Sequence, residues 1–533
     1  MTQTDNSLSI ATARDIKSRL GSDSAKTVAV IGSGFGGLSL AIRLQSAGVK
    51  TTLYEKRDKL GGRAYVYEQD GYTFDAGPTV ITEPASLEEL FELTGARLSD
   101  YVDLMRVDPF YRLLWEDGFS FDYCQDEASL LSQIEAKSPD DVEGYKRFHD
   151  YSEDLYVEGY QKLGAVPFLN FWSMIKAAPQ LAKLQGYRSV YGRLSDFVKD
   201  KHLREAFSFH SLLVGGDPFK TSAVYSLIHA LERRGGIWFP RGGTGALVKG
   251  LGRFFEDIGG EIKLNAPVSE VTVVDDKCRE VITAEGERRA FDAVASNADV
   301  VHTYENLLGK SKRGANMGKG LKSKRFSNSL FVIYFGTNKK FENLVHHTIM
   351  FGPRYRELIS DIFSGPGLPD DFSLYLHRPT ASDPNLAPDG CDSFYVLSPV
   401  PNLEKAPVDW SVEGEKYKQK IYQYLEERYM PGLRDSIVTD RIFTPAHFES
   451  ELNAHAGSAF SIEPILTQSA YFRIHNRDDQ ISNLYFVGAG AHPGAGVPGV
   501  VGSAKATAGL MVEDLGVSYP TTAPENQPAI AAE

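Results

Sequence analysis

The feature that most constrains this chain is a glycine cluster between an apolar run and a helical segment. Residues Gly32 to Gly37 read Gly-Ser-Gly-Phe-Gly-Gly and contain the spacing G-x-G-x-x-G. The apolar run Thr27–Ile31 precedes them, residues 38–45 follow with helical spacing, and a second strand is expected at residues 50–54. Strand, glycine turn, helix and strand in this order predict the opening of a dinucleotide-binding domain.

The residue types in this segment match what a bound diphosphate requires. Gly32 permits the tight turn, Gly34 lets the backbone approach the pyrophosphate, and Gly37 lets the helix pack against the strand. The helix N-terminus then presents its amides and partial positive charge to the phosphates. Glu55 follows Gly34 by 21 residues and can accept from both ribose hydroxyls, which makes NADP the least favoured dinucleotide. The predicted cofactor contacts here are Gly32, Ser33, Gly34, Gly36, Gly37, Glu55 and Lys56.

Length, charge and cysteine content narrow the class of protein. A chain of 533 residues is long enough for two to four lobes. Its formal net charge of -13 argues against a nucleic-acid partner, because phosphate binding relies on clustered Lys and Arg. Cys124, Cys278 and Cys391 form no CxxC pair and have no histidine spacing that would hold zinc, so we predict no metal site and a reducing compartment.

A second glycine cluster favours FAD over NAD. Leu60-Gly-Gly-Arg63 is followed by Gly71-Tyr-Thr-Phe-Asp-Ala-Gly-Pro78. This segment resembles the glycine-arginine signature of the flavoproteins that include amine oxidases, protoporphyrinogen oxidases and carotenoid desaturases. The resemblance implies that Gly62 and Arg63 continue the pyrophosphate site of an FAD, where a guanidinium can bind two phosphate oxygens.

The glycine-rich stretch near the C-terminus is the most specific in the chain. Residues 488–502 read Gly-Ala-Gly-Ala-His-Pro-Gly-Ala-Gly-Val-Pro-Gly-Val-Val-Gly and resemble the C-terminal signature of bacterial-type phytoene desaturases. Such glycines let backbone lie flat against a planar ring, and the N-terminus of the helix that follows would stabilise negative charge near flavin N1. The expected flavin contacts are Gly488, Gly490, Val497, Pro498, Gly499 and Val500.

The resemblance to this desaturase family extends from about residue 27 to residue 515. It includes Trp238-Phe-Pro-Arg-Gly-Gly-Thr-Gly245 and Ala293-Val-Ala-Ser-Asn-Ala298. It implies a role in carotenoid biosynthesis, with FAD-dependent desaturation of 15-cis-phytoene in successive two-electron steps to neurosporene or all-trans-lycopene. It also implies that Val268 presents its backbone to the adenine. The implied partners are the membrane-dissolved polyene, a membrane surface, and oxygen or a quinone as terminal electron acceptor.

The chemistry of a hydrocarbon substrate limits what the protein must supply. Phytoene has no hydroxyl or amine, so hydride transfer from an allylic carbon to flavin N5, followed by proton loss, would form each double bond. Relatives carry an acid-base candidate pair at the run Asp150-Tyr-Ser-Glu153, where this chain has an acid in place of the arginine. Asp150 is therefore the catalytic candidate, with a solvated helix residue as the equally weighted alternative. His210 and His229 are expected to be structural rather than catalytic.

The pattern of helix and strand signals divides the chain. Residues 86–234 are mainly helical in pattern, strand patterns return at 262–264, and an apolar strand at 484–487 runs into the last glycines and a final helix. We therefore predict an α/β protein: a Rossmann-like FAD-binding domain with a β-sheet substrate domain and a helical, membrane-associating insert. The expected boundaries are a flexible N-terminal extension 1–25, FAD-binding segments 26–95, 235–302 and 476–515, the insert 96–234, the substrate-binding domain 303–475 and a flexible tail 516–533.

The insert contains a candidate membrane-docking segment. Val166-Pro-Phe-Leu-Asn-Phe-Trp-Ser-Met-Ile175 is followed by Lys176, Lys183 and Arg188. Apolar and aromatic residues with nearby cations suit an interfacial helix, and a core helix of the insert is the alternative. No run of about 20 apolar residues occurs that would cross a membrane. The predicted location is cytoplasmic, with peripheral association at the inner face of the cell membrane.

Other functions are compatible with the same fold and motifs. A related carotenoid isomerase, a ketolase or a diapophytoene desaturase would carry the same motifs. A non-catalytic prenyl-binding chaperone, like the Rab escort and dissociation-inhibitor proteins, is the alternative from a different class. The sequence does not set the number of desaturation steps, the electron acceptor, the acid-base residue, the oligomeric state or the tightness of FAD binding.

Overall fold

A parallel sheet forms the centre of the cofactor lobe. The computed structural model describes residues 25–520, so most of the expected N-terminal extension and tail lies outside the described residues. The sheet has five strands in the order β19-β13-β1-β2-β9, and every pairing is parallel. Three separate stretches of chain contribute to it: β1 (Thr27–Ile31), β2 (Lys50–Tyr54), β9 (Glu261–Lys263), β13 (Ala293–Ser296) and β19 (Leu484–Phe486).

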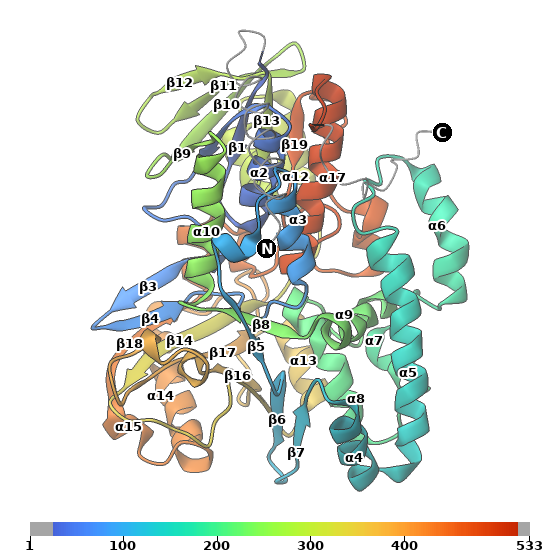
Figure 1. Cartoon of the computed structure of the whole chain (residues 1–533), viewed down its shortest axis with the longest axis vertical. Coiled ribbons are helices and arrows are strands. Elements are labelled where there is room, and N and C mark those ends of the chain that lie inside the picture. The colour runs from blue at the N-terminus through green and yellow to red at the C-terminus, as the bar shows by residue number, and fades with distance from the viewer. Residues whose placement is uncertain (1–24, 521–533) are drawn as a thin grey trace, which may run out of the picture.

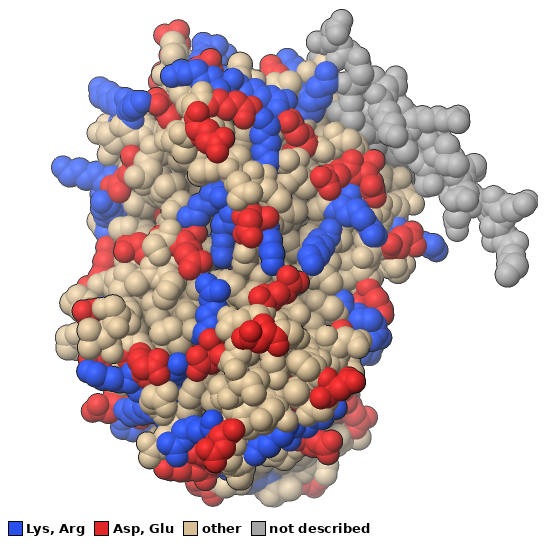
Figure 2. Space-filling view, turned by 90° about the vertical axis from the view of Figure 1, so that its left-hand side faces the viewer, with Lys and Arg blue, Asp and Glu red and all other residues tan. Residues whose placement is uncertain are grey.

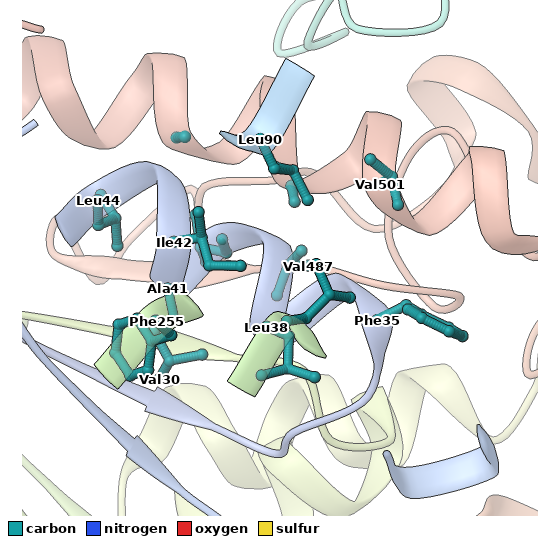
Figure 3. Packing of buried hydrophobic residues seen from close by; sticks show 14 of the residues in the cluster. Val30, Phe35, Leu38, Ala41, Ile42, Leu44, Leu90, Phe255, Val487 and Val501 are labelled. Carbon is teal, nitrogen blue, oxygen red and sulfur yellow. The ribbon is translucent and has the colours of Figure 1, made fainter. Parts of the chain in front are cut away.

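Helices cover one face of this sheet and bury its apolar side chains. Helix α2 (Phe35–Ser46) begins within the glycine cluster, is buried along its whole length and packs against α17 (Val497–Leu515). Helices α3 (Pro84–Glu92) and α10 (Thr244–Asp257) complete the layer. Figure 3 shows the resulting core, in which side chains from α2 meet Leu90, Phe255, Val487 and Val501. Because this core fixes α2 against β1, it also fixes the glycine turn between them.

The opposite face of the sheet packs against an antiparallel layer. Strands β10 (Val268–Val274), β11 (Lys277–Thr283) and β12 (Arg288–Ala290) form a three-stranded sheet at the top of Figure 1. Buried residues of this layer and of α11 (Val300–His302) and α12 (Lys312–Leu321) share one cluster with Ala29 and Ile31 of β1. The five-stranded sheet is therefore covered on both faces, as parallel sheets require.

A second, larger sheet forms the lower part of the molecule. Its order is β18-β14-β17-β16-β15-β6-β7, and all pairings are antiparallel except that of β15 with β6. Side chains alternate along β14: Phe331 and Ile333 pack toward α14 (Trp410–Arg428), whereas Val332 and Tyr334 face a cavity. The strands are β6 (Tyr111–Trp115), β7 (Ser120–Tyr123), β14 (Ser329–Thr337), β15 (His347–Phe351), β16 (Leu374–His377), β17 (Asp392–Val400) and β18 (Ile437–Phe443).

Short elements join the two sheets. Two-stranded ribbons are formed by β3 with β4 and by β5 with β8, and Figure 1 shows them between the two lobes. The remaining helices of the lower lobe flank the large sheet. These elements are β3 (Val66–Gln69), β4 (Tyr72–Asp75), β5 (Leu104–Val107), β8 (Ile237–Pro240), α13 (Tyr355–Ser364), α15 (Leu433–Ser436) and α16 (Pro445–Leu452).

The helical insert lies on the right of Figure 1 and begins later than expected. Residues 104–123, which the sequence places in the insert, form β5, β6 and β7. Residues 111–115 pair in parallel with β15, more than 200 residues later in the chain, and this long-range pairing leaves no local signal. The helices of the insert are α4 (Glu127–Lys137), α5 (Val142–Leu155), α6 (Phe171–Lys183), α7 (Val190–Leu194), α8 (Lys201–Ser208) and α9 (Leu227–Gly235).

Two surface properties bear on partners. Among the described residues, no helix has both the length and the apolar character needed to cross a bilayer. On the face shown in Figure 2, Lys and Arg are interspersed with Asp and Glu rather than gathered by sign. The absence of a nucleic-acid partner stays a prediction from the net charge of -13.

Candidate active site

A cavity of about 810 Å³ joins the cofactor lobe, the large sheet and the insert. One end lies at the carboxyl ends of β1 and β2, which is where open parallel sheets bind nucleotides. The other end is walled by β14, β16 and β17 and by residues of the insert. The cavity therefore offers two connected environments, a glycine-rich cradle and an apolar chamber.

The glycine turn presents the N-terminus of α2 to the cavity. Gly34 is the N-cap of α2, and among the described residues no side chain caps this end. Gly32, Gly34 and Gly36 line the cavity, as do Ser33 and Phe35. Free amides at a buried helix N-terminus need an acceptor, and a phosphate is the group they bind best. A diphosphate fits this end of the cavity.

Glu55 is fixed against the glycine turn. Its Oε2 accepts hydrogen bonds from the amide of Ser33 at 3.1 Å and from its hydroxyl at 2.5 Å, and its Oε1 accepts from the amide of Arg57 at 2.9 Å. The same Ser33 hydroxyl accepts from the amide of Gly61 at 3.1 Å. The carboxylate lines the cavity, so Glu55 both links the two glycine clusters and can accept from a ribose.

Close packing requires the glycines of the turn. A Cβ on Gly37 would overlap the carbonyl oxygen of Gly32, and a Cβ on Gly36 would lie 2.7 Å from Oδ1 of Asn297. Asn297 follows β13 and donates from Nδ2 to the Gly32 carbonyl at 3.2 Å. Asn297 lines the cavity and packs against the glycine turn, a role that the sequence analysis did not assign. Its place directly after the strand in Ala-Ser-Asn-Ala was the available signal.

Arg63 lies where a pyrophosphate ligand is expected. Its Nε donates to the carbonyl of Ala459 at 2.7 Å, which orients the guanidinium toward the cavity that it lines. Burial lowers the pKa of Arg63, and the carboxylate of Asp299 opposes this shift. Asp299 also lines the cavity, where its Oδ1 accepts from the first amides of α11. A desolvated guanidinium binds phosphate more strongly than an exposed one.

The remaining nucleotide contacts predicted from the sequence lie beside Glu55. Lys56 lines the cavity, donates from Nζ to Oδ1 of Asn453 at 3.0 Å, and has its pKa lowered chiefly by burial. Val268 begins β10 and also lines the cavity. The amide of Ala266 donates to the Glu55 carbonyl at 2.9 Å, which brings Val268 next to the proposed ribose position.

The C-terminal glycines form the opposite side of the cradle. Val497, Pro498, Gly499 and Val500 open α17 and line the cavity, and no described side chain caps this helix end. Gly488 and Gly490 do not line the cavity themselves but lie behind the residues that do. A Cβ on Gly488 would overlap Asn297, and a Cβ on Gly490 would overlap Val300. Two uncapped helix N-termini thus face one cavity, an arrangement that suits a dinucleotide with a reducible ring.

Two side chains outside the predicted cofactor contacts hold this loop in place. Arg473 is buried and donates from Nη2 to the carbonyls of Ala489 at 2.6 Å and Ile462 at 3.0 Å. His492 is also buried, and burial lowers its pKa to about 4. Its Nε2 lies 3.3 Å from the carbonyl oxygen of Leu163, and its ring meets that of Phe168 edge-on. His492 therefore connects the glycine-rich loop of residues 488–496 to the insert.

The far part of the cavity is apolar. Val332, Ile349, Phe351 and Leu397 line it from the large sheet, and the insert adds Phe168, Leu181, Phe209, Leu212, Leu227, Ile228 and Leu231. Hydroxyls occur where the two parts meet: Thr79 Oγ1 lies 2.6 Å from the hydroxyl of Tyr395 and 3.1 Å from that of Tyr375. Such a lining suits a hydrocarbon and excludes water.

The candidate docking segment is apolar on two sides. Phe171 and Trp172 of α6 are 51% and 71% exposed, whereas Phe168, Met174 and Leu181 line the cavity. The segment therefore lies between solvent and the apolar chamber, at the upper right of Figure 1.

Asp150 is not brought to the site. It lies on α5, is exposed and is not among the residues that line the cavity. The structure favours the alternative in which Asp150 is a solvated helix residue. His210, by contrast, is buried beside Glu232, an acid of α9 that lines the cavity and that sequence reasoning did not single out.

Known proteins resemble this chain over most of its length. The sequence profile described as "Flavin containing amine oxidoreductase" matches residues 35–512. A phytoene desaturase (lycopene-forming) of Pseudescherichia vulneris is 62% identical over 92% of this chain and 100% of its own. A phytoene desaturase (neurosporene-forming) of Rhodobacter capsulatus is 42% identical over 90% and 93%. A putrescine oxidase structure with bound putrescine superposes with a TM-score of 0.59 at 17% identity, over 92% of this chain and 99% of that one.

Proposed function

The chain belongs to the flavin containing amine oxidoreductase family and is an FAD-dependent oxidoreductase; on this premise we propose that it desaturates 15-cis-phytoene to all-trans-lycopene. The observation that carries the proposal is the apolar chamber that opens directly onto the cofactor cradle. A long hydrocarbon needs length and mostly apolar walls, and this chamber provides such walls. The relative at 62% identity is named for this reaction.

The chain's own contribution is alignment and exclusion of water. The bound FAD would supply a two-electron acceptor for hydride, held by the turn at Gly32–Gly37, by Glu55 and Arg63, and by the start of α17. Tyr375 and Tyr395, with Thr79 between them, form a chain of hydrogen bonds and so leave few polar groups facing the polyene. The apolar walls at Val332, Leu397 and Leu231 would hold an allylic carbon beside the cofactor and keep water from the cation.

The number of desaturation steps is inferred from the sequence identity to two relatives. The lycopene-forming relative is 62% identical and the neurosporene-forming relative 42% identical, so we favour lycopene as the product. Chromatography of polyenes after incubation of the FAD-loaded protein with phytoene in liposomes tests this. Lycopene as the final species supports the proposal, and neurosporene that persists at long times contradicts four-step desaturation.

The substrate is expected to reach the chamber from lipid. Phytoene is insoluble in water, and the segment around α6 has aromatic side chains toward solvent and apolar side chains toward the cavity. The proposed location is therefore the inner face of the cell membrane, with peripheral attachment through residues 163–191. Oxygen or a quinone would reoxidise the flavin, and the two are distinguished by turnover under argon with an added quinone.

The alternative activities predict different products. An isomerase would change the geometry of an added polyene without lengthening its conjugation, and a ketolase would add oxygen. A diapophytoene desaturase would act on the shorter chain in preference to phytoene, which a competition between the two substrates measures. A chaperone without a cofactor is disfavoured by the family assignment and by two uncapped helix N-termini that face the cavity.

A further inference from the structure

An acidic side chain lies in the apolar part of the cavity. Within the described residues, four acids line the cavity, and three of them, Glu55, Asp299 and Glu451, belong to the nucleotide end. The fourth is Glu232, on helix α9, which Figure 1 shows between α5 and the ribbon of β5 and β8. Its cavity neighbours on the same helix are Leu227, Ile228 and Leu231.

The carboxylate of Glu232 lies between the side chains of Tyr111 and His210. Its Oε1 accepts a hydrogen bond from the hydroxyl of Tyr111 at 2.8 Å. The Nε2 of His210 lies 2.9 Å from Oε2, an ion-pair distance. Among the described residues Oε2 has no hydrogen-bond partner, and the oxygen itself is buried. Glu232 is 0% exposed and His210 is 3% exposed. One oxygen is therefore anchored by Tyr111, and the other is buried beside His210.

Burying the carboxylate of Glu232 in this position lowers the stability of the fold, so its presence points to a functional role. Moving a carboxylate from water to an apolar interior costs several kcal/mol even with a partner, and an apolar residue would fill the same space more stably. The burial of Tyr111 and the charge of Glu232 also raise the pKa of Tyr111 well above its usual value, so the phenol stays a donor. An acid buried at the wall of a largely apolar cavity is a candidate for a catalytic role.

We propose that Glu232 accepts the proton in each desaturation and stabilises the cation that precedes it; this rests on the proposed function. Loss of hydride to the oxidised flavin leaves an allylic cation on the polyene. A C–H bond on the neighbouring carbon then breaks, its electron pair becomes the new C=C bond, and its proton passes to the carboxylate of Glu232, whose side chain must turn toward the chamber to receive it. The carboxylic acid then returns that proton to water before the next step.

The first test measures binding without turnover. A long-chain polyprenyl dimethylamine, protonated at neutral pH, carries its charge as the cation would, and the hydrocarbon of the same length is the uncharged reference. Both are titrated into FAD-loaded protein and followed through the flavin absorbance. We expect the wild type to prefer the amine and Glu232→Gln to lose that preference by about tenfold or more.

A matched control tests whether the effect requires a charge at the cavity wall or follows from the loss of any buried charge. Glu205 on α8 is also buried and accepts from Nε1 of Trp115 at 2.8 Å, but it does not line the cavity. Glu205→Gln should keep the amine preference of the wild type. Glu232→Asp keeps a carboxylate and should restore most of the preference, which provides a second variant if Glu232→Gln fails to retain flavin.

The second test is turnover of phytoene at equal FAD content. Glu232→Gln should lower it at least about tenfold, and Glu205→Gln should leave it within about twofold. An unchanged amine preference in Glu232→Gln would overturn the role of Glu232 even if the wild type desaturates phytoene. A wild type that forms no conjugated product would instead refute the proposed function, and the binding test would still show whether Glu232 recognises a cation.

Discussion

One oxygen of Glu55 accepts hydrogen bonds from both the amide and the hydroxyl of Ser33, at 3.1 and 2.5 Å. This contact joins the end of β2 to the glycine turn that follows β1, so the acid that is expected to bind ribose also sets the shape of the phosphate cradle. Because Ser33 and Glu55 are in contact, the spacing from Gly34 to Glu55 in the sequence reflects a real contact between the glycine turn and the acidic residue.

Removing the charge of Glu55 should weaken FAD binding. Glu55→Gln loses charge-assisted hydrogen bonds worth about 1.5–3 kcal/mol, so the Kd for FAD should rise about 10- to 100-fold. Titration of apoprotein with FAD, followed by flavin fluorescence, measures it. Glu68→Gln is the control, because Glu68 is 58% exposed and pairs only with Lys59 among the described residues. An unchanged Kd in Glu55→Gln would contradict the ribose role.

A methyl group at Gly37 should disrupt the turn. Its Cβ would overlap the Gly32 carbonyl, so Gly37→Ala should cost about 1–3 kcal/mol of stability and lower the FAD content of purified protein. Gly320→Ala is the matched control, since Gly320 lies within helix α12 and a Cβ there would meet no described atom within 4 Å. That change should be neutral or slightly stabilising. Thermal unfolding and flavin absorbance of both variants provide the comparison.

Acid should weaken the contact between the glycine-rich loop of residues 488–496 and the insert. Burial lowers the pKa of His492 to about 4, below its unfolded value of 6.5, so its contribution to stability is present above pH 6.5 and is lost as pH falls toward 4. The loss attributable to this group is at most about 3 kcal/mol. His492→Gln removes the titration, so its stability should fall less steeply than that of the wild type between these pH values. Parallel curves for both proteins would refute this assignment.

The exposed aromatics of α6 should carry membrane binding. Changing Phe171 and Trp172 to Ser should reduce binding to liposomes about tenfold or more, because both side chains are at least half exposed. FAD content should not change. The control changes Val412 and Val438 to Ser, which are 52% and 51% exposed on α14 and β18. Equal losses in both variants would mean that α6 has no special role.

Local patterns predict the elements that local chemistry determines. Strands β1 and β2 have the residues expected from their apolar runs, and the glycine turn lies between β1 and α2 as the spacing requires. The α/β fold class and the FAD-binding family follow from the same motifs. These features are visible in sequence because each depends on residues close together in the chain.

Features that depend on distant contacts are not visible in the sequence. The local pattern places strand β6 in a helical insert because its partner β15 is far away in the chain. The resemblance to relatives favours Asp150 as the acid-base residue. In the structure Asp150 is exposed, whereas Glu232 is buried and accepts a hydrogen bond from Tyr111 of a distant segment. Arg473 gives no signal, since its partners are backbone carbonyls. Side-chain roles set by the tertiary fold therefore require the structure.

The most direct measurement is an anaerobic incubation of the FAD-loaded protein with phytoene in liposomes. Flavin bleaching in its visible band is followed together with the polyenes that form. We expect bleaching to accompany the first new double bond, with about one reduced flavin for each bond formed. Conjugated product without bleaching, or a polyene changed only in geometry, would contradict the proposed desaturation.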